Sequence, residues 1–484
     1  MEIRGKDFVW EYVIGLEVHA QISSQSKLFS SAANCFDAPP NTQVSFIDAA
    51  FPGTLPVLNW ACVEQSAKSG LGINAKINLF SAFDRKNYFY PDLPRGYQIS
   101  QFYHPIAENG WIDIVDEEGK IKRIGVTRLH LEQDAGKSLH DYSPGYTCID
   151  LNRAGVPLME IVSEPDIRSP FEAGQYLRKL RSILRYIGSC NGDMEKGELR
   201  CDANVSVRKK GEREFGTRCE IKNLNSIRHV MKAIEFEGKR QVESLEKGIS
   251  IKQATMLFSP ESGETKIMRL KEDAQDYRYF PEPDLPPILL TKAQVESIAA
   301  SLPELPEAKV SRYSSSLLVT EADAKVIAAD KETALYFEEV IALGIKPQLA
   351  ANWVTGILFS LLKEHDCEIH ECKITPKDLA KLINLVEEEK ISGKAAKIVC
   401  STMFGGNKDV DLIIEQMDLT QITDPNRIEQ IVDQVLKIEE ETAIAYRSGK
   451  HKVFNFLVSA VLKHSSGKAS PSLVQEILRK KLES

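Results

Sequence analysis

Acidic and histidine side chains recur on one face of predicted β-strands in roughly the first 290 residues. In the segment VIGLEVHAQI, Glu17 and His19 alternate with apolar residues. In RIGVTRLHLE, His130 and Glu132 also share one face. Side chains two residues apart in a strand point to the same side of a sheet. Such pairs can act together on one substrate if the two strands lie close in the fold.

Two further acids lie in similar surroundings, Glu160 in PLMEIVSEPD and Asp202 in LRCDANVSV. Carboxylates that project from neighbouring strands repel each other unless a cation lies between them, and Mg²⁺ is a common choice. Charged side chains on alternating strands also commonly face water. The residues alone therefore leave two interpretations open, a magnesium site and a solvated sheet face.

Basic side chains occur in comparable segments. They are Arg85, Lys86, Arg128, Lys137, Arg153, Arg200, Lys222 and Arg278. Carboxylates with Mg²⁺, together with Arg and Lys, are what phosphoryl transfer requires, because the cations offset charge on the phosphate oxygens. Individually, each of these basic residues could equally belong to a surface ion pair.

The segment HLEQDAGKS (residues 130–138) ends like a nucleotide-binding P-loop, but it does not fit that motif. The motif G-x-x-x-x-G-K-[ST] needs glycine at the position of Leu131. Glu132 and Asp134 would also repel the phosphates that the loop should bind. We therefore exclude a P-loop and look for another role for these acids.

Two cysteine motifs are interpreted structurally. GSCNG (residues 188–192) matches a nucleophile elbow by composition, but it follows a helix end and not a strand, so it predicts a turn. CEIHEC (residues 367–372) lacks a second ligand pair nearby, so it predicts a loop between helices and not a zinc site.

The composition is that of an ordinary soluble protein. The chain has 484 residues, 43% of them hydrophobic and 27% charged, and this length predicts two to four domains. A net charge of −8 argues against coating of nucleic acid by the whole surface. The charged N-terminus lacks a signal-peptide core, no apolar run has the ~18 residues of a membrane span, and the nine cysteines are scattered. We expect a cytoplasmic protein with reduced thiols and no contact with a membrane.

The elements that must position the acids form a mixed α and β region. Residues 198–208 and 217–224 predict further strands. Between the strands, a helix should begin after Ser169 as N-cap, with Pro170 in its first turn, and end at Gly188. The proline-rich segment at 277–290 ends this region.

From about residue 293 the sequence repeats near 3.6 residues, which predicts helices. The segment MFGGNKD (residues 403–409) is the best linker within this half. We therefore predict an α+β fold in three parts. A cradle domain with a mixed, largely antiparallel sheet spans 1–292, a helical connector spans 293–405, and a small helical tail spans 406–484.

The tail is basic in a chain that is otherwise acidic. From residue 447 to 484 there are eight Lys or Arg residues and two acids. The basic residues near its two Gly-Lys turns are Arg447, Lys450, Lys452, Lys463 and Lys468. Such a run is either a solvated helix face or a surface that contacts RNA phosphates, and charge alone leaves both interpretations open.

The segment IDLNRAGVPLMEIVSEPD (residues 149–166) resembles the signature of the B component of the bacterial aspartyl/glutamyl-tRNA(Asn/Gln) amidotransferase, the GatB family. Other segments agree with it, among them VIGLEVHAQI, PGTLPVLN, FDRKNYFYPDLPRGYQISQ, RLHLEQDAGKS, LRCDANVSV, EIKNLNS and DYRYFPEPDLPP. The resemblance covers essentially the whole chain, including the helical tail.

The resemblance implies a heterotrimer, whose other members are an amidase that acts as a glutaminase (the A component) and a small C component. Ammonia released by the glutaminase reaches the B component, where ATP activates the carboxylate of misacylated Glu-tRNA or Asp-tRNA as an acyl phosphate. The product is Gln-tRNA or Asn-tRNA, so the expected activity is that of a glutamine-dependent amidoligase. Two alternatives are a non-catalytic tRNA-binding scaffold and the archaeal relative specific for Glu-tRNA, whose extra inserted domain this chain has no room for.

The resemblance also implies roles for individual residues. The implied Mg²⁺ ligands are Glu17, His19, Glu132, Glu160 and Asp202. Glu132 and Glu160 would also be catalytic together with Lys86, which would lie on the path of ammonia or phosphate. Arg153, Lys222 and Arg128 would hold ATP, and the five basic residues of the tail would contact tRNA.

The chain departs from the family pattern in one respect. Many relatives carry two cysteine pairs of zinc-knuckle type before PGTLPVLN, whereas this segment keeps only Cys35. One thiolate cannot build a four-coordinate zinc site. We therefore expect no structural zinc, and we expect packing to hold this loop.

Overall fold

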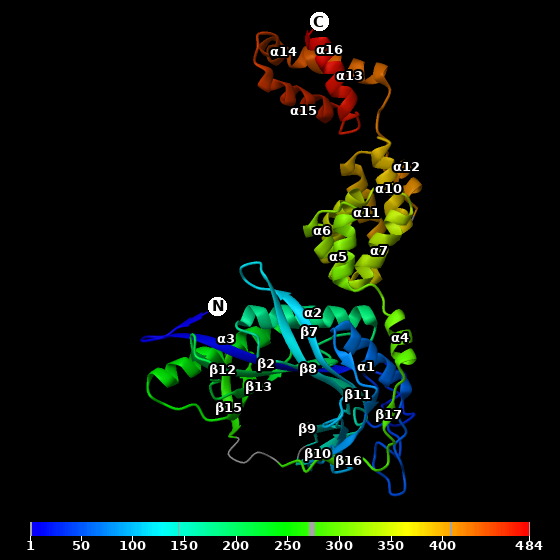
Figure 1. Cartoon of the computed structure of the whole chain (residues 1–484). Coiled ribbons are helices and arrows are strands. Elements are labelled where there is room, and N and C mark those ends of the chain that lie inside the picture. Colours follow the sequence, from blue (N-terminus) through cyan, green and yellow to red (C-terminus); the bar gives the residue numbers. More distant parts are fainter. Residues whose placement is uncertain (1, 144, 271–275, 407–408, 484) are drawn as a thin grey trace. The chain divides into compact units, whose positions relative to one another are not determined.

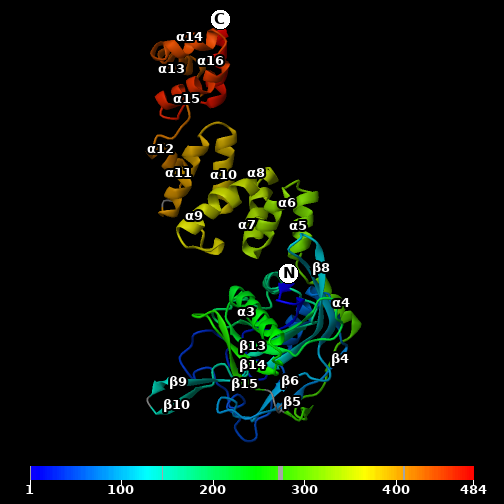
Figure 2. The same ribbon diagram turned by 90° about the vertical axis from the view of Figure 1, so that its left-hand side faces the viewer.

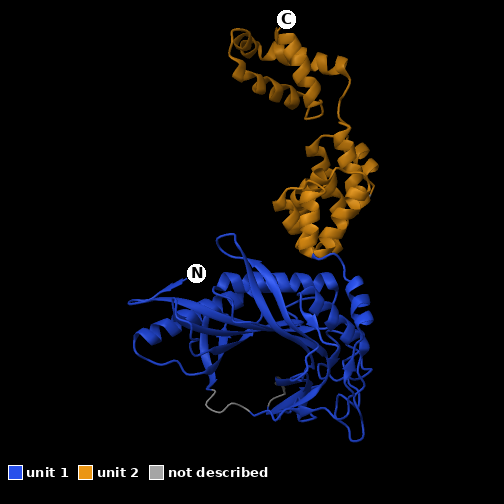
Figure 3. Cartoon of the chain, viewed as in Figure 1, with its two compact units in different colours: residues 1–305 blue, residues 306–484 orange. Residues whose placement is uncertain are grey.

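The computed structural model describes residues 2–143, 145–270, 276–406 and 409–483. The chain forms two compact units, Met1–Leu305 and Pro306–Ser484, which Figure 3 shows in different colours. Within the described ranges, no helix is both long and apolar enough to cross a bilayer.

The first unit combines strands and helices. Its strands are β1 (Glu2–Arg4), β2 (Val9–Gln21), β3 (Lys76–Ile77), β4 (Phe80–Ser81), β5 (Asp84–Asn87), β6 (Tyr97–Ser100), β7 (Ala107–Val115), β8 (Ile121–Gln133), β9 (Lys137–Ser143), β10 (Tyr146–Asp150), β11 (Pro157–Ser163), β12 (Leu199–Lys209), β13 (Cys219–Leu224), β14 (Ala254–Ser259), β15 (Glu264–Leu270), β16 (Phe280–Pro281) and β17 (Ile288–Leu289). Its helices are α1 (Trp60–Gly72), α2 (Pro170–Ile187), α3 (Ile227–Glu246) and α4 (Lys292–Ala300).

A ten-stranded sheet forms the centre of this unit, with the order β15-β14-β13-β12-β2-β11-β8-β7-β3 and β1 paired to β2. Neighbouring strands are antiparallel except β13 and β14, which are parallel. With the helices and the helical second unit, this confirms the predicted α+β class and the largely antiparallel sheet.

The two faces of the sheet differ, as the alternating sequence predicts. Leu16, Val18 and Ala20 of β2 are fully buried in the core that also holds residues of α2 and α3. Glu17 and His19 therefore point to the opposite face. Figure 1 shows α2 and α3 on one side of the sheet and β9, β10 and β16 on the other. The acids consequently lie on the side away from the two helices.

Helix α2 begins and ends at the predicted residues. The hydroxyl of Ser169 accepts a hydrogen bond from the Glu172 backbone N–H, which satisfies one of the free donors of the first turn. Pro170 occupies the first turn, and Gly188 ends the helix with a left-handed φ of 80°. Helix α2 packs on the face of the sheet opposite to Glu17 and His19.

Among the described residues of the first unit, three small sheets accompany the large one. They are β16-β5-β6, β10-β9 and β17-β4. In Figure 2, β5 and β6 lie with β9 and β10 in the lower part of this unit, below β13 and β14. Strand β6 contacts β8 of the large sheet. The small sheet β16-β5-β6 is therefore placed beside the strand that carries His130 and Glu132.

A buried ion pair helps to hold the loop that contains Cys35. Lys27, whose side chain is fully buried, places its Nζ 3.3 Å from Asp48 Oδ2 and 2.7 Å from the Ala154 carbonyl oxygen. The Ser30 hydroxyl lies 3.0 Å from Asp48 Oδ1. Buried charges need such partners because they lose their hydration.

We expect Lys27→Met to lower the free energy of unfolding of the first unit by about 3–5 kcal/mol. The change keeps a similar volume but leaves Asp48 buried without its cation. Denaturant unfolding of the full chain, compared with wild type, measures the effect. The double variant Lys27→Met/Asp48→Asn should recover part of the loss, and a loss below about 1 kcal/mol for the single variant would show that the pair is not essential.

The second unit is helical, as the 3.6-residue repeat predicts. Its elements are α5 (Pro306–Ser315), α6 (Glu321–Ala328), α7 (Lys331–Ala342), α8 (Pro347–Asn352), a π-helical stretch (Trp353–Leu358), α9 (Phe359–Glu364), a 3₁₀ turn (Ile369–Glu371), α10 (Pro376–Glu387), α11 (Gly393–Phe404), α12 (Val410–Gln416), α13 (Pro425–Ile438), α14 (Glu440–Arg447), a second 3₁₀ turn (His451–Val453), α15 (Phe454–His464) and α16 (Pro471–Glu483).

Two separate hydrophobic cores divide this unit. The first contains buried residues from Tyr313 to Ile414, and the second contains residues from Ile428 to Leu482. Helix α12 contributes to the first of these cores, and α4 packs against α1 in the first unit. The boundary expected at 292/293 lies before α4, although α4 packs within the first unit. The boundary expected at 405/406 lies before α12, although α12 packs in the first helical core. Residues 407–408 of the predicted linker 403–409 lie outside the described residues.

Candidate active site

The sheet register brings acids and histidines from three strands together. In β11, Glu160 lies opposite His19 of β2 on one side and opposite His130 of β8 on the other. Glu132 lies two residues beyond His130 on the same face of β8. The four side chains, which we call the acid site, therefore meet on the face away from α2 and α3.

Each imidazole of the acid site contacts both carboxylates. His19 Nε2 lies 3.4 Å from Glu132 Oε1 and 3.4 Å from Glu160 Oε2. His130 Nε2 lies 3.3 Å from Glu160 Oε2 and 3.7 Å from Glu132 Oε2. The Glu132 side chain is only 3% exposed, and that of Glu160 is 13% exposed. The solvated-face interpretation is therefore wrong for these two acids.

The pairing fixes the charges of the acid site. Burial on its own would raise the pKa of Glu132, but hydrogen bonds from His130 and His19 lower it to about 2. Burial would lower the pKa of His19, but the hydrogen bonds and negative charges of Glu132 and Glu160 outweigh burial and raise this pKa well above its usual value. The two carboxylates are therefore ionised at neutral pH, and positive charge between them stabilises this arrangement.

The acid site has the donor set of a cation site. Ligand atoms of His19, Glu132 and Glu160 all lie within 4.8 Å of one another, and they form the one such group found among the described His, Cys, Asp and Glu residues. The carboxylate oxygens suit Mg²⁺, and an imidazole nitrogen suits it less well. The residues present thus fit a divalent cation held mainly by Glu132 and Glu160.

The other two predicted metal ligands are arranged differently. Glu17 and Asp202 are opposite each other on β2 and β12, but Glu17 accepts a hydrogen bond from Asn204, with a distance of 2.8 Å. Asp202 Oδ2 lies 2.6 Å from Lys222 Nζ, which also lies 2.8 Å from Glu220 Oε1. An ammonium group therefore already supplies the charge that Asp202 needs.

Lys86 lies close to the acid site without a direct ion pair to it in the described residues. Its Nζ sits 5.1 Å from the ring centre of Tyr277 and 5.9 Å from that of Tyr88. Burial would lower the pKa of Lys86, but the negative charges of Glu132 and Glu160 raise it above its usual value. Lys86 therefore stays a charged ammonium under the influence of these two carboxylates.

The two arginines expected at the nucleotide have different surroundings. Arg153 Nε lies 3.0 Å from the Ala135 carbonyl oxygen and 3.6 Å from Asp134 Oδ2. The guanidinium of Arg128 lies 5.6 Å from the ring centre of Phe102, and its buried Nε has no hydrogen-bond partner in the described part of the chain. The roles of both arginines at a nucleotide stay predictions.

No role was predicted from the sequence for His130, although its position on the same strand face as Glu132 pointed to one. His130 shares the strand face of Glu132 and lies opposite Glu160. Its Nδ1 is buried without a hydrogen-bond partner among the described residues, so the ring is held through its Nε2 contacts. No role was predicted either for Ser100, whose Oγ lies 3.4 Å from Glu132 Oε2. Sequence alone could not place Ser100 near Glu132, because their proximity depends on the contact between β6 and β8.

The basic residues of the tail lie on and near two turns. Gly449 and Gly467 have left-handed φ values of 97° and 78°, so both Gly-Lys segments are turns. Three lysines are exposed and have no ion pair in the described structure: Lys450, Lys452 and Lys463. Lys468, in contrast, pairs with Asp418, and Arg447 donates to the Lys481 carbonyl oxygen.

The two cysteine motifs have structural surroundings. Cys190 is 1% exposed, and burial raises the pKa of its thiol to about 12, so it is a poor nucleophile at neutral pH. CEIHEC contains a 3₁₀ turn between α9 and α10, as predicted for a loop between helices. The predicted turn at GSCNG is also confirmed, since Gly188 ends α2.

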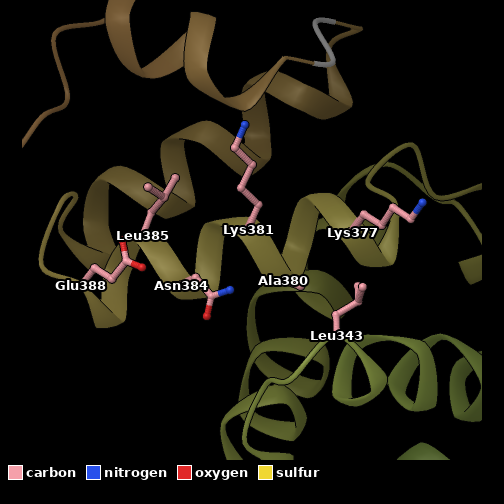
Figure 4. Close-up of a pocket in the computed structure, with 7 residues that line it drawn as sticks. All are labelled: Leu343, Lys377, Ala380, Lys381, Asn384, Leu385 and Glu388. Atoms are coloured by element: carbon pink, nitrogen blue, oxygen red, sulfur yellow. The ribbon is translucent and has the colours of Figure 1, made fainter.

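A shallow pocket of 360 Å³ lies within the second unit and is shown in Figure 4. It is lined by Leu343, Lys377, Ala380, Lys381, Asn384, Leu385 and Glu388. In Figure 4, the Lys377 and Lys381 side chains extend in different directions from α10, and the Lys381 ammonium lies 2.5 Å from Asp411 Oδ2. This pocket contains no residue that the sequence predicts to be functional.

Comparisons with known proteins cover nearly the whole chain. The family model described as the GatB/GatE catalytic domain matches residues 12–296, and that described as the GatB domain matches residues 335–482. A protein of Orientia tsutsugamushi (strain Ikeda), named as the B subunit of an aspartyl/glutamyl-tRNA(Asn/Gln) amidotransferase, is 56% identical over 480 residues, which are 99% of this chain and 98% of that protein. Proteins of the same name from Rickettsia bellii (strain RML369-C) and Rickettsia rickettsii (strain Sheila Smith) are also 56% identical, with 98% of both chains covered in the first case and 100% and 99% in the second.

Proposed function

Because this chain belongs to the GatB/GatE family, we propose that it is the amidating subunit of an aspartyl/glutamyl-tRNA(Asn/Gln) amidotransferase. Its substrate would be the side-chain carboxylate of Glu or Asp carried by a misacylated tRNA. The observation that carries this proposal is the acid site, in which Glu132 and Glu160 converge from neighbouring strands although they repel each other.

Amidation of a carboxylate needs prior activation, because oxide is a very poor leaving group. Transfer of the γ-phosphoryl group of ATP to a carboxylate oxygen would give an acyl phosphate and ADP. Ammonia would then attack the carbonyl carbon, form the C–N bond and expel inorganic phosphate, and its surplus proton would pass to a base. The reaction thus requires a site that offsets the negative charge of phosphate.

Different residues of the chain would bind the cation, the phosphate groups and the rest of ATP. When bound, Mg²⁺ would offset charge on the phosphate oxygens. Glu132 and Glu160 would hold it, and His19 and His130 would orient these carboxylates through the contacts already formed. Lys86 would offset charge on the transferred phosphate, and Arg128, Arg153 and Lys222 would bind the rest of ATP.

Ammonia would come from a partner protein. We propose a glutaminase of the amidase type as its source and a small third protein as the remaining member of the heterotrimer. Delivery inside the complex keeps ammonia away from bulk water, where protonation would remove its nucleophilic lone pair. The buried Cys190 has the wrong pKa for a glutaminase nucleophile in this chain, which favours a separate source of ammonia.

The alternative is a non-catalytic protein that only binds tRNA. A scaffold gains nothing from two ionised carboxylates that must be stabilised by two imidazoles in a nearly buried position. The reconstituted complex, supplied with ATP, Mg²⁺ and ammonia, should convert Glu-tRNA or Asp-tRNA to the amidated form. If a glutaminase-deficient complex with an intact acid site makes no product from ammonia, the scaffold is favoured.

The exposed lysines of the tail should contribute to tRNA binding. We expect the triple change of Lys450, Lys452 and Lys463 to Gln to weaken tRNA binding and to reduce the magnitude of its salt slope by about two to three, since each phosphate contact contributes roughly 0.7–0.9. The KM for aminoacyl-tRNA should rise, and kcat should change less. Titration of tRNA onto the complex at several salt concentrations measures both effects.

The matched control changes Lys120, Lys239 and Lys325 to Gln, because these lysines are exposed and end in surface ion pairs. It removes the same charge from other positions. Equal affinities and equal salt slopes in the tail variant and wild type would mean that the basic run is only a solvated face.

A further inference from the structure

A continuous row of aromatic rings lies beside the acid site. It comes from the segments after β5 and β6 and from the segment before β16. We call this row the aromatic wall, and it consists of Tyr88, Tyr90, Phe102, Tyr103, Tyr277 and Tyr279.

The rings contact one another in sequence. Tyr277 lies between Tyr88 and Tyr279, with ring centres 6.1 Å apart on both sides. Tyr279 stacks on Phe102 with centres 4.1 Å apart and planes inclined by 16°. Tyr103 follows Phe102 at 4.9 Å in an edge-on arrangement. The wall is thus one connected surface and not a scatter of separate rings.

The backbone that carries the wall is held firmly. The Asn87 side chain donates to the carbonyl oxygens of Tyr277 and Arg278, at 3.0 and 2.8 Å. Arg85 forms a two-pronged ion pair with the buried Glu282, with both distances 2.8 Å. A surface held in this way needs little ordering when a ligand binds, which favours affinity.

Short contacts connect the wall with the acid site. The Tyr88 hydroxyl donates to Gln98 Oε1 at 3.2 Å, and Gln98 donates to the carbonyl oxygen of Gln133, next to Glu132. The Tyr88 end of the wall is therefore linked through Gln98 to the strand that carries Glu132, and Lys86 lies over Tyr277.

Parts of the wall are exposed to solvent. Tyr90 is 53% exposed, Phe102 is 38% exposed and Tyr103 is 58% exposed. Arg128 lies over Phe102, so a cation accompanies the exposed rings. Exposed aromatic rings with a cation and a connected row behind them are typical of surfaces that bind single-stranded nucleic acid.

We propose that the aromatic wall stacks with the unpaired 3′-terminal bases of aminoacyl-tRNA and so directs the aminoacyl group into the acid site. This rests on the proposed function, which makes a tRNA-linked carboxylate the substrate. Stacking on a base face is tolerant of sequence. It therefore suits an end that is shared by all tRNAs and leaves tRNA discrimination to other surfaces.

The test uses the intact complex with Tyr103→Ala, and Tyr103→Phe as the variant that retains the ring. Loss of one stacked base should raise the KM for Glu-tRNA about 5- to 100-fold, with kcat and the KM for ATP changed less than about twofold. Tyr103→Phe should restore the KM. Phe215→Ala, which removes an exposed ring outside the wall, serves as control.

A second readout uses tRNA with 2-aminopurine as its terminal base, whose fluorescence is quenched by stacking. Wild type and Tyr103→Phe should quench it, and Tyr103→Ala should quench it less. An unchanged KM with full quenching in Tyr103→Ala overturns the proposal. A selective rise in the KM for ATP, or a selective loss of glutamine-supported activity, also overturns it by assigning the ring to ATP or to the ammonia path.

The two proposals fail in different ways. If the complex amidates Glu-tRNA but does not quench the terminal base, the wall has another role and the proposed function stands. If the complex quenches the terminal base but forms no amidated product with ATP and ammonia, base stacking stands and the proposed function is wrong.

Discussion

Glu132→Gln is expected to lower ammonia-supported amidation of Glu-tRNA by roughly two to four orders of magnitude. The change keeps the size of the side chain but removes a charge from the centre of the acid site. Glu132 contacts His19, His130 and Ser100, and these contacts would hold its oxygens in place for the proposed cation. An amide is a far weaker ligand for Mg²⁺ than a carboxylate.

The assay supplies ammonia directly, so that glutaminase activity in the proposed partner protein does not limit the rate. Glu118→Gln is the matched control, because Glu118 lies in the turn before β8 and is 72% exposed. It should retain nearly wild-type activity. Near-normal rates in Glu132→Gln, at saturating ATP and Mg²⁺, would exclude a metal-holding role for this carboxylate.

Lys86→Met is expected to lower kcat by roughly 10²–10³-fold with either glutamine or ammonia, since loss of one oriented electrostatic group in an active site has effects of this size. The negative charges of Glu132 and Glu160 raise the pKa of Lys86 against the effect of burial, so its side chain is a charged ammonium. It would offset the charge on the phosphate as that group is transferred. Methionine keeps most of the length of the side chain and removes only the charge.

Metal affinity separates this role from that of the carboxylates. Removal of Lys86 takes positive charge away from the acid site, so Mn²⁺, used as a spectroscopic probe, should bind at least as tightly as in wild type while turnover falls. Lys120→Met, at an exposed lysine, is the control. A kcat within threefold of wild type in Lys86→Met would contradict the proposed role.

Much of the acid site could be predicted from local sequence. Alternation fixes which side chains share a face, and it correctly separated Glu17 and His19 from Leu16 and Val18. The helix behind the sheet could be bounded as well, because Ser169 and Gly188 carry their capping roles in their residue types. Local sequence rules therefore predict which residues share a face of a strand and where a helix begins and ends.

Strand register could not be predicted, and it decides which acids meet. Glu160 lies between His19 and His130 only because β11 pairs with both β2 and β8. Asp202 lies one strand further along, where Lys222 of β13 reaches it. Without this pairing order, the five expected ligands could not be divided into an acid site and a neighbouring ion pair.

Charge patterns in sequence also do not show which charges are already paired. Lys468 belongs to the basic run, but Asp418 lies beside it in the fold. Lysine is usually exposed, but the Lys27 side chain is fully buried and pairs with Asp48. Both pairs join residues that are far apart along the chain, so only the folded structure shows them.

In the proposed reaction, this chain activates a tRNA-linked carboxylate by phosphoryl transfer at the acid site. Glu-tRNA labelled with ¹⁸O in the side-chain carboxylate reports on this transfer in the reconstituted complex with ATP and ammonia. One ¹⁸O atom should appear in inorganic phosphate for each Gln-tRNA formed, and Glu132→Gln should lower the amounts of both products together by roughly two to four orders of magnitude. Formation of Gln-tRNA with unlabelled phosphate would contradict it.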